Sequence, residues 1–310
     1  MRSIRPEATS PALELAVVVP TLNERENIAP LLAGLRKTLD GINHEIIFVD
    51  DDSTDGTPER IAEAGRLDRS IRLIRRYGRR GLSSAVTEGA LSTTAPIIAV
   101  IDADGQHDES LLPQLFAAIA RGNADIAVGT RYAVGGSLGD LDRRRSLISR
   151  LATRTAAIVT GTRLSDPMSG FFAFRQSSLM TALPRLSGTG FKILLDLLAS
   201  SREPLRVVEL PYRFRARRNG SSKLDSAVAL QFLAMLIDKR IGHLLPLRLL
   251  MFLSVGALGL AVHLSVLDML LGPARMGFDS AQVSAVITAM TLNFFLNNAF
   301  TYRDRRLRGA

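Results

Sequence analysis

Short apolar runs alternate with amphipathic stretches up to about residue 210 of the chain. This alternation predicts successive βα units and a mostly parallel sheet. The predicted strands are 15–19, 45–49, 71–74, 97–101 and 125–128, and the predicted helices are 25–39, 57–65, 82–92 and 109–121. We therefore expect an α/β fold with a Rossmann-like sheet, whose ligand site lies beyond the carboxyl ends of the strands.

The pattern changes after residue 225, where two long apolar stretches follow one another. Residues 249–271 contain only His263 and Asp268 as ionisable side chains, and residues 280–302 carry no charge. Helices of this length can cross a hydrocarbon core of about 30 Å. The pattern therefore predicts two transmembrane helices. A buried hairpin in a soluble protein is the alternative, which the length of both stretches disfavours.

The charges around these stretches predict their orientation. Lys239, Arg240 and Arg248 precede the pair, and the segment after it contains four arginines, Arg303, Arg305, Arg306 and Arg308. The connection at 272–279 has one Arg and one Asp. By the positive-inside bias, both ends of the pair face the cytoplasm. We expect a multi-pass protein of the cell membrane with a cytoplasmic α/β domain at 1–223, interfacial helices at 224–247 and a transmembrane hairpin at 248–310.

Composition narrows the classes of function. The chain has no cysteine, which excludes disulfides, thiolate zinc sites and a cysteine nucleophile. Its net charge of +9 suits nucleic acid, anionic lipid or a phosphorylated substrate. Because the chain has no Trp and no recognisable nucleic-acid motif, lipid and phosphate are favoured as partners, and nucleic acid is not expected.

Two carboxylates follow the fourth predicted strand. Asp102 and Asp104 are two residues apart, with Gln106 next in the same loop. Such a pair can hold one hard cation and leave coordination positions for diphosphate oxygens. Aspartates after a strand also form ordinary turns, so this motif alone leaves both interpretations open. The polar segments 21–24 and 50–55 follow the first two strands and are expected at the same edge of the sheet.

The ordered set of these segments resembles family 2 glycosyltransferases of the A-type fold, and more narrowly the dolichol-phosphate mannose synthases. The resemblance starts from Pro20-Thr21-Leu22-Asn23-Glu24, Val49-Asp50-Asp51 and Asp102-Ala103-Asp104. It extends through Gly81-Leu82-Ser83-Ser84-Ala85, Gly129-Thr130-Arg131-Tyr132, Arg145 with Ser149, Asp166-Pro167-Met168-Ser169-Gly170, Gly190-Phe191-Lys192 and Gly220-Ser221-Ser222-Lys223. It covers nearly the whole chain.

The resemblance implies roles for individual residues. The base and ribose pocket would be lined by Pro20, Leu22, Glu24, Val49 and Asp51, with Ala103 also at the nucleotide sugar. Asp102, Asp104 and Gln106 would hold Mg or Mn, and Arg217 and Lys223 would clamp the diphosphate. Arg131, Arg145 and Ser149 would bind the acceptor phosphate and, with Asp104, form the catalytic set.

The implied reaction transfers one sugar, mannose from GDP-mannose, to a polyprenyl (dolichyl) phosphate with inversion. A lipid phosphate has a second pKa of about 6. Near neutral pH it is therefore already deprotonated, and the reaction needs no strong general base. A UDP-glucose or other UDP-sugar donor is the alternative within the class. An alternative of another class is a membrane protein that binds a nucleotide sugar or lipid carrier without turnover; loss of the metal ligands would indicate it, and they are present. A processive synthase is less consistent with a chain that has no Trp.

The chain departs from the family pattern at a few positions. Leu22 stands where the family often has Tyr, Gly105 replaces a common Leu, and residues 108–109, Asp-Glu, replace a common Pro-Pro. None of these removes a metal ligand. In the second apolar stretch Asn293, Asn297 and Asn298 are costly against lipid, so they are expected to face another helix or a second subunit, as in a homo-oligomer.

Overall fold

The computed structural model describes residues 12–131, 162, 164–167, 169–186, 193–215 and 247–298. The chain divides into two compact units, Met1–Leu236 and Ile237–Ala310. The predicted boundary at residue 223 and residues 224–246 of the predicted interfacial segment lie outside the described residues. Those domain boundaries therefore stay predictions, and each unit is described on its own.

The first unit is built on one seven-stranded sheet in the order β3-β2-β1-β4-β6-β5-β7. The strands are β1 (Leu15–Thr21), β2 (His44–Asp50), β3 (Ile71–Arg75), β4 (Ile97–Val100), β5 (Ile126–Thr130), β6 (Phe172–Arg175) and β7 (Val207–Pro211). β6 runs antiparallel to both of its neighbours, and every other pairing is parallel. The predicted mostly parallel sheet is confirmed.

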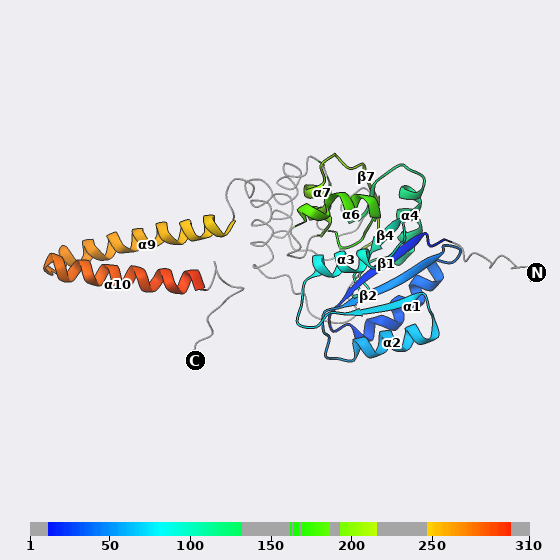
Figure 1. Cartoon of the computed structure of the whole chain (residues 1–310), viewed down its shortest axis with the longest axis horizontal. Coiled ribbons are helices and arrows are strands. Elements are labelled where there is room, and N and C mark those ends of the chain that lie inside the picture. The colour runs from blue at the N-terminus through cyan, green and yellow to red at the C-terminus, as the bar shows by residue number, and fades with distance from the viewer. Residues whose placement is uncertain are drawn as a thin grey trace, which may run out of the picture. The chain divides into compact units, whose positions relative to one another are not determined.

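Helices cover both faces of this sheet (Figure 1). One face packs against α1 (Arg25–Thr38), α2 (Thr57–Leu67) and α4 (Leu112–Ala120), which follows the 3-10 turn η1 (Glu109–Leu111). The other face packs against α3 (Leu82–Leu91), α6 (Gln176–Ala182) and α7 (Ile193–Ser200). In β1, Val17 and Val19 face the first layer, and Val18 faces the second. Both faces are therefore buried, which explains the continuous apolar runs of the strands.

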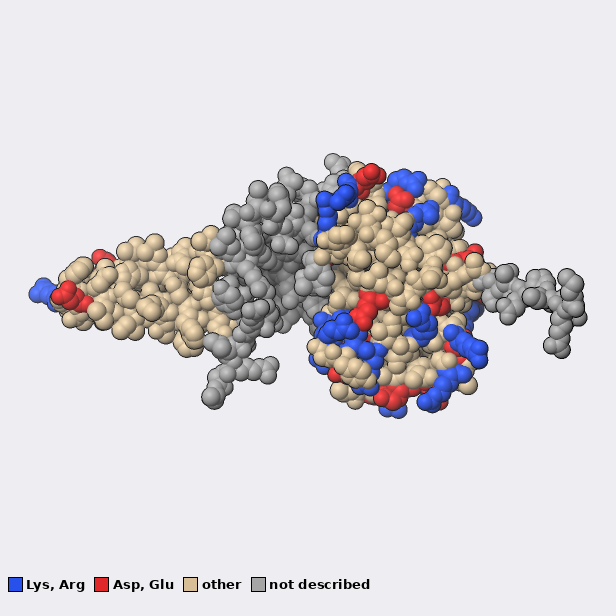
Figure 2. Space-filling view, viewed as in Figure 1, with Lys and Arg blue, Asp and Glu red and all other residues tan. Residues whose placement is uncertain are grey.

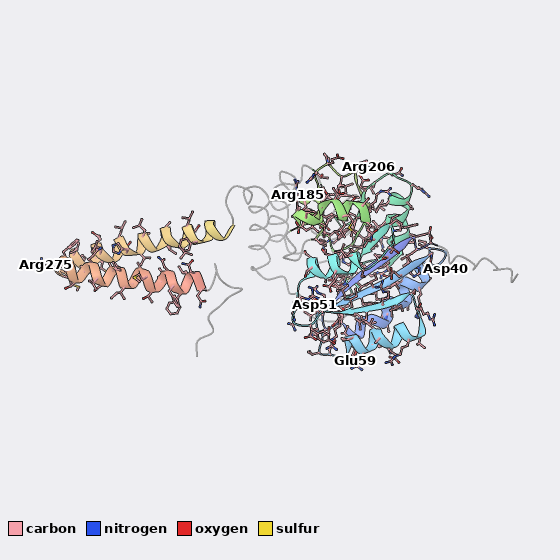
Figure 3. All side chains as sticks on the ribbon, viewed as in Figure 1. Asp40, Asp51, Glu59, Arg185, Arg206 and Arg275 are labelled. Atoms are coloured by element: carbon pink, nitrogen blue, oxygen red, sulfur yellow. The ribbon has the colours of Figure 1, made fainter. Side chains whose placement is uncertain are left out.

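The strand order predicts a ligand site at the carboxyl edge of the sheet. From β1 the chain moves outward to β2 and β3, and then returns to the other side of β1 with β4. Such a reversal of direction leaves room for a ligand beyond the strand ends. Asp51 lies at this edge, directly after β2, whereas Asp40 lies at the opposite edge, before β2 (Figure 3). The predicted loops at 21–24, 50–55 and 102–107 all follow strands that end here.

The predicted strands and helices of this unit agree with the structure to within a few residues, with one difference in kind. The predicted helix 109–121 begins with the 3-10 turn η1 before α4 starts at Leu112. The strands β6 and β7 were not among the predicted strands. β6 has only four residues and runs against its neighbours, so no local βα pattern marks it.

The second unit contains a hairpin of α9 (Leu247–Leu271) and α10 (Phe278–Leu296). Its turn is closed by backbone bonds, from Gly272 N to Asp268 O (2.9 Å) and from Met276 N to Leu270 O (2.9 Å). A stripe of small residues on α10, Ala281, Ala285 and Ala289, is buried. The visible face of the described hairpin is bare of charge except around the turn (Figure 2).

The two helices differ in how well they suit a bilayer. Within the described residues, one helix is long and apolar enough to cross a membrane, Phe252–Leu271. α10 is interrupted by polar side chains, among them Gln282 and Asn293, and the end of the second predicted span, 299–302, lies outside the described residues. The first predicted span is thus supported, and the second stays a prediction.

Candidate active site

The loops that follow β1 and β2 are joined into one wall. Asn23 N donates to Ser53 Oγ (2.8 Å), and Thr54 N donates back to Asn23 Oδ1 (3.0 Å). One residue along, Glu24 N donates to Thr57 Oγ1 (2.9 Å). Asn23 sits in the left-handed region, with φ of 57°. These reciprocal bonds hold the two segments together at the carboxyl edge of the sheet.

Asp50 has a structural role in this wall. It is fully buried and accepts hydrogen bonds from Thr21 Oγ1 (3.0 Å), Ser53 N (2.8 Å) and Ser53 Oγ (2.6 Å). Its carboxylate is therefore occupied in closing the turn after β2. This is the turn-forming behaviour that aspartates after a strand commonly show.

Asp51 faces the loop between β3 and α3. Its Oδ2 accepts from Gly81 N (2.7 Å), and its Oδ1 lies 3.0 Å from Nη1 of Arg76, whose side chain is 2% exposed. Burial raises the pKa of the Asp51 carboxyl, while the Gly81 hydrogen bond and the Arg76 charge oppose that rise. Glu88 also lies 3.5 Å from Arg76 Nε. The orientation of Asp51 is thus set by groups about 25 to 30 residues further along the chain.

The five residues predicted to line the base and ribose pocket are brought to one place. Pro20 and Val49 are direct partners in the β1–β2 register. Leu22 and Glu24 follow β1 and are half-buried, and Asp51 follows β2. Their common position agrees with the prediction. Their contact with a nucleotide stays a prediction.

The predicted metal ligands lie in the loop after β4. Asp104 Oδ1 accepts from Gln106 N (3.1 Å), which tightens the loop, and Ala103 is buried beneath it. The side-chain amide of Gln106 donates to Arg215 O (3.3 Å). This bond uses the amide nitrogen of Gln106, and nitrogen is not the atom that a hard cation would take.

Asp102 is held by His107, which is buried. His107 Nε2 lies 3.3 Å from Asp102 Oδ2, and Nδ1 lies 2.7 Å from the hydroxyl of Tyr212. Because a carboxylate oxygen accepts, these contacts fit the tautomer of His107 that is protonated at Nε2. Burial raises the pKa of the Tyr212 hydroxyl far above its ordinary range, so Tyr212 stays protonated and can donate to Nδ1. The chain Tyr212–His107–Asp102 thereby orients one carboxylate.

The donor chemistry of this loop fits a divalent cation. Within the described part of the chain, no group of three His, Cys, Asp or Glu side chains is placed to hold a metal ion. Two carboxylates and one amide oxygen supply the hard oxygen ligands that Mg²⁺ and Mn²⁺ prefer, and such sites often complete their coordination with substrate phosphates. His107 would act as the outer partner that orients Asp102.

Arg131, at the end of β5, is fixed by two different contacts. Its Nε and Nη2 donate to the two oxygens of buried Asp166, at 2.8 and 3.2 Å. Its guanidinium lies 4.8 Å from the ring centroid of Phe214. Asp166 is in turn placed by Glu209 of β7, which accepts from Asp166 N at 3.3 Å. Arg131 is therefore a preorganised cation at the same edge of the sheet.

Four predicted site residues lie outside the described residues: Arg145, Ser149, Arg217 and Lys223. Their roles at the acceptor phosphate and the diphosphate stay predictions.

Comparison with known proteins decides the family. A model of the glycosyl transferase family 2 matches residues 16–183, and a model of the GtrA/DPMS transmembrane domain matches residues 251–310. The dolichol-phosphate mannosyltransferase of Pyrococcus furiosus is 35% identical over 95% of this chain and 82% of its own length. The enzyme of the same name from Saccharomyces cerevisiae is 37% identical over 73% and 86%.

The chain belongs to the dolichol-phosphate mannosyltransferases of glycosyl transferase family 2.

A solved structure agrees in fold with this family 2 enzyme. Glucosyl-3-phosphoglycerate synthase of Mycobacterium tuberculosis, in complex with Mn²⁺, UDP-glucose and phosphoglyceric acid, matches with a TM-score of 0.55. The match covers 73% of this chain and 79% of that one, at 23% identity. The A-type glycosyltransferase fold expected from the sequence is confirmed.

The structure adds residues of this glycosyltransferase that the sequence analysis did not assign. His107 directly follows a predicted ligand, so its position was a usable signal. Asp166 stands in a quoted motif but was given no role. Tyr212 and Glu209 belong to the poorly marked strand β7 and its end, and Arg76 resembles any surface arginine in sequence. Their roles depend on contacts across the sheet.

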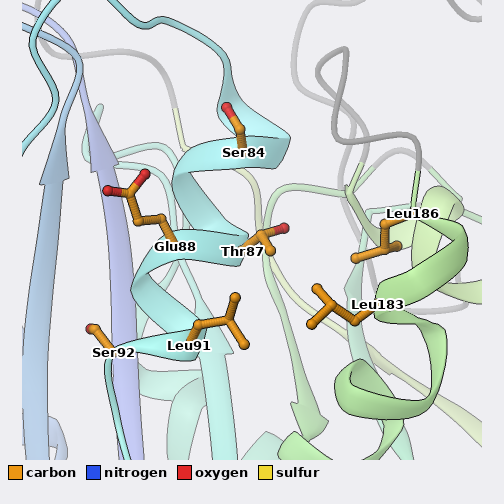
Figure 4. Close-up of a pocket in the computed structure, with 7 residues that line it drawn as sticks. All are labelled: Ser84, Thr87, Glu88, Leu91, Ser92, Leu183 and Leu186. Atoms are coloured by element: carbon orange, nitrogen blue, oxygen red, sulfur yellow. The ribbon is translucent and has the colours of Figure 1, made fainter.

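A separate groove of about 480 Å³ lies between α3 and the 3-10 turn η2 (Leu183–Arg185) (Figure 4). Its walls are mostly apolar and include Leu91, Leu183 and Leu186. None of the residues predicted to bind nucleotide, metal or acceptor lines it. We therefore keep this groove apart from the candidate active site.

Proposed function

We propose that this enzyme transfers one mannose from GDP-mannose to dolichyl or another polyprenyl phosphate, with inversion, at the cytoplasmic face of the membrane. The observation that carries the proposal is the loop after β4, where Asp102, Asp104 and Gln106 follow the strand next to β1 at the reversal point of the sheet. The similarity to dolichol-phosphate mannosyltransferases over 95% of the chain supports the choice of donor and acceptor.

Asp102, Asp104 and Gln106 would hold Mg²⁺ or Mn²⁺. When bound, the cation would neutralise negative charge on the leaving diphosphate. The Mn²⁺ in the solved synthase of the same fold supports this assignment. In this chain, His107 keeps the Asp102 carboxylate oriented, and the turn from Asp104 Oδ1 to Gln106 N keeps the two remaining ligands close in the loop.

The remaining site residues bind and position two phosphorylated substrates. Arg217 and Lys223 bind the donor diphosphate, and Arg131, Arg145 and Ser149 bind the acceptor phosphate. Arg131, whose Nε and Nη2 donate to Asp166, is held as a fixed cation that suits a charge-assisted bond to a phosphate oxygen. Arginine forks and a bound cation place most of the catalytic work in positioning and charge stabilisation.

The reaction balances without a general base. A phosphate oxygen of the acceptor forms a bond to the anomeric carbon of mannose. The bond from that carbon to the β-phosphate oxygen breaks, and the electron pair leaves with GDP. Because the acceptor oxygen is already deprotonated near neutral pH, no side chain has to remove a proton. Attack opposite to the leaving group inverts the anomeric configuration.

The hairpin supports a membrane location for this chemistry. The match to the GtrA/DPMS transmembrane domain and the span Phe252–Leu271 support membrane attachment. A multi-pass arrangement with a cytoplasmic catalytic domain follows from the charge bias around the hairpin. An acceptor with a polyprenyl tail would then reach the enzyme from the bilayer.

The test is a transfer assay with the full-length chain in detergent, dolichyl phosphate and Mn²⁺, comparing GDP-mannose with UDP-glucose. We expect transfer from GDP-mannose, and we expect Asp104→Ala to abolish it and to weaken GDP binding measured by calorimetry. Asp40→Ala is the matched control, because Asp40 is exposed at the opposite edge of the sheet (Figure 3). Transfer from UDP-glucose alone would overturn the donor, and near-native activity of Asp104→Ala would overturn the site.

A further inference from the structure

The segment after β7, residues 212–215, is hydrogen-bonded to residues 106–109 of the proposed metal-binding loop. Arg215 N donates to Gln106 O (2.8 Å), and the Gln106 side chain donates back to Arg215 O (3.3 Å). Three residues earlier, Tyr212 meets His107. The two strings of residues, 106–109 and 212–215, are more than 100 positions apart in the chain. Their contact is therefore a purely tertiary feature of the site.

The side chain of Arg215 closes this contact with a fork over two adjacent carboxylates. Its Nη1 donates to Glu109 Oε2 (2.7 Å), and its Nη2 donates to Asp108 Oδ1 (2.8 Å). We call these three residues the clasp. A planar guanidinium with fixed donors can satisfy both acids at once, which a lysine ammonium cannot do with the same geometry.

Both acids of the clasp are held in place by other contacts. Asp108 Oδ1 also accepts from Ser110 N and Ser110 Oγ, at 3.2 and 2.7 Å, which caps the turn η1. The Glu109 carboxylate lies against Gly34 of α1, where a methyl group would collide with it. The positions of both carboxylates are thus fixed by contacts outside the clasp. Arg215 joins them from the segment that follows β7.

The clasp is poorly suited to be a fold stabiliser. The Arg215 side chain is 39% exposed, and the two acids are 28% and 22% exposed. Ion pairs this open to water contribute little to stability. The strand β7 is already held in the sheet by its pairing with β5. What the clasp adds is a defined position for the residues that follow β7.

We propose that Arg215, through Asp108 and Glu109, is a positioning residue for the loop that holds Gln106 and, through the cation, for the donor diphosphate. Arg215 and Gln106 are joined by two hydrogen bonds, and Asp108 and Glu109 follow Gln106 in the same loop. The inference rests on the proposed function for the role of Gln106 as a metal ligand. According to this inference, the affinity for a nucleoside diphosphate and its cation depends on the clasp, although the clasp contacts neither the diphosphate nor the cation.

The test uses four variants of the full-length chain in detergent: Arg215→Met, the double variant Asp108→Asn/Glu109→Gln, the combination of all three changes, and Arg206→Met. The amide replacements keep the shape of the acids, and the Asn keeps an oxygen for Ser110. Arg206→Met is the matched control, because Arg206 forms a comparable fork with Asp125 before the amino end of β7. Calorimetry measures GDP and UDP binding in the presence of Mn²⁺.

We expect Arg215→Met and the double acid variant each to weaken binding of the nucleoside diphosphate by about tenfold, as losses of outer partners at metal sites commonly do. The triple variant should lose no more than either, because all the changes act on one shared contact. In turnover, KM for the nucleotide sugar should rise and KM for the lipid phosphate should not. Melting temperatures should stay within about 4 °C of the parent chain.

Several outcomes would overturn the proposal. Diphosphate affinities within twofold of the parent chain, losses that multiply in the triple variant, or an equal loss in Arg206→Met would each do so. If Arg215→Met unfolds, the acid variant, which leaves Arg215 in place, decides the matter. Failure of the proposed function would be visible in the parent chain itself, which would then not bind GDP and would not transfer mannose.

Discussion

At the scale of single residues, the Asp102 carboxylate shows how this site is prepared. One of its oxygens faces His107 Nε2 at 3.3 Å, and the carboxylate also packs against Gly170. Gly170 precedes β6 by two positions and reaches Asp102 because β6 pairs with β4. Because Gly170 has no side chain, the Asp102 carboxylate has room to adopt a position in which it could bind a cation.

Gly170→Ala should therefore impair metal binding more than folding. The new methyl group would collide with the far end of the Asp102 side chain, which can rotate away at little cost to stability. We expect Mn²⁺ affinity to fall about tenfold, measured by calorimetry with GDP, and the melting temperature to change by less than about 4 °C. Gly256→Ala is the control, because a methyl group there meets nothing. Unchanged Mn²⁺ affinity would contradict this role for Gly170.

At the scale of elements, the hairpin is held by small residues and one amide. Ala281, Ala285 and Ala289 recur at every fourth position of α10, and Asn293 continues the series. The Asn293 side chain lies against Gly259 of α9. Small residues allow close helix approach in membranes, and an amide is costly against lipid. The expectation that Asn293 faces another helix is met within the hairpin itself.

Gly259→Ala should loosen the hairpin, because the methyl group would collide with the Asn293 amide. Overpacking of this kind costs about 1–3 kcal/mol, whereas Ala at an open helix position gains about 1 kcal/mol over Gly. Gly256→Ala, three residues away and open, is the matched control. Thermal unfolding in detergent should rank Gly256→Ala above the parent and Gly259→Ala below it.

Asn293→Ala should rescue Gly259→Ala, because it removes the side chain that the methyl group meets. The double variant should be more stable than Gly259→Ala alone. If Asn293→Ala gives no recovery, the contact between these two residues does not limit the packing of the hairpin.

At the scale of the whole molecule, the chain joins an α/β transferase to an apolar hairpin. The hairpin turn carries Arg275, which is labelled in Figure 3. Clusters of Lys and Arg lie before the first helix of the hairpin and after its second helix in the sequence. This asymmetry is the basis for the prediction that the turn and the catalytic unit lie on opposite sides of the membrane.

Single-cysteine labelling can test that orientation without background, because the chain has no cysteine. Gly277→Cys lies in the exposed turn, and Arg60→Cys lies on the exposed face of α2. A membrane-impermeant maleimide should label Gly277→Cys in intact cells and Arg60→Cys only after permeabilisation. Labelling of both positions only after permeabilisation would contradict the transmembrane hairpin, because α9 would then not cross the membrane between them.

Much of this protein follows from its sequence alone. Burial leaves a local trace, so the runs at 15–19 and 97–101 predicted strands, and residues 249–271 predicted a membrane-length helix. Parallel strands end at one edge, so the position of Asp102 after its strand already indicated where the site lies. The family resemblance rested on residues in these loops, and the comparisons confirm it.

Only the tertiary structure decided how the site is supported. The reversed strand β6 between β4 and β5, the burial of Arg76 beside Asp51, and the contact of His107 with Tyr212 join segments that are distant in sequence. The fork of Arg215 over Asp108 and Glu109 spans more than 100 positions. Side-chain partners of this kind depend on which strands become neighbours in the sheet, and local hydrophobic patterns carry no record of that choice.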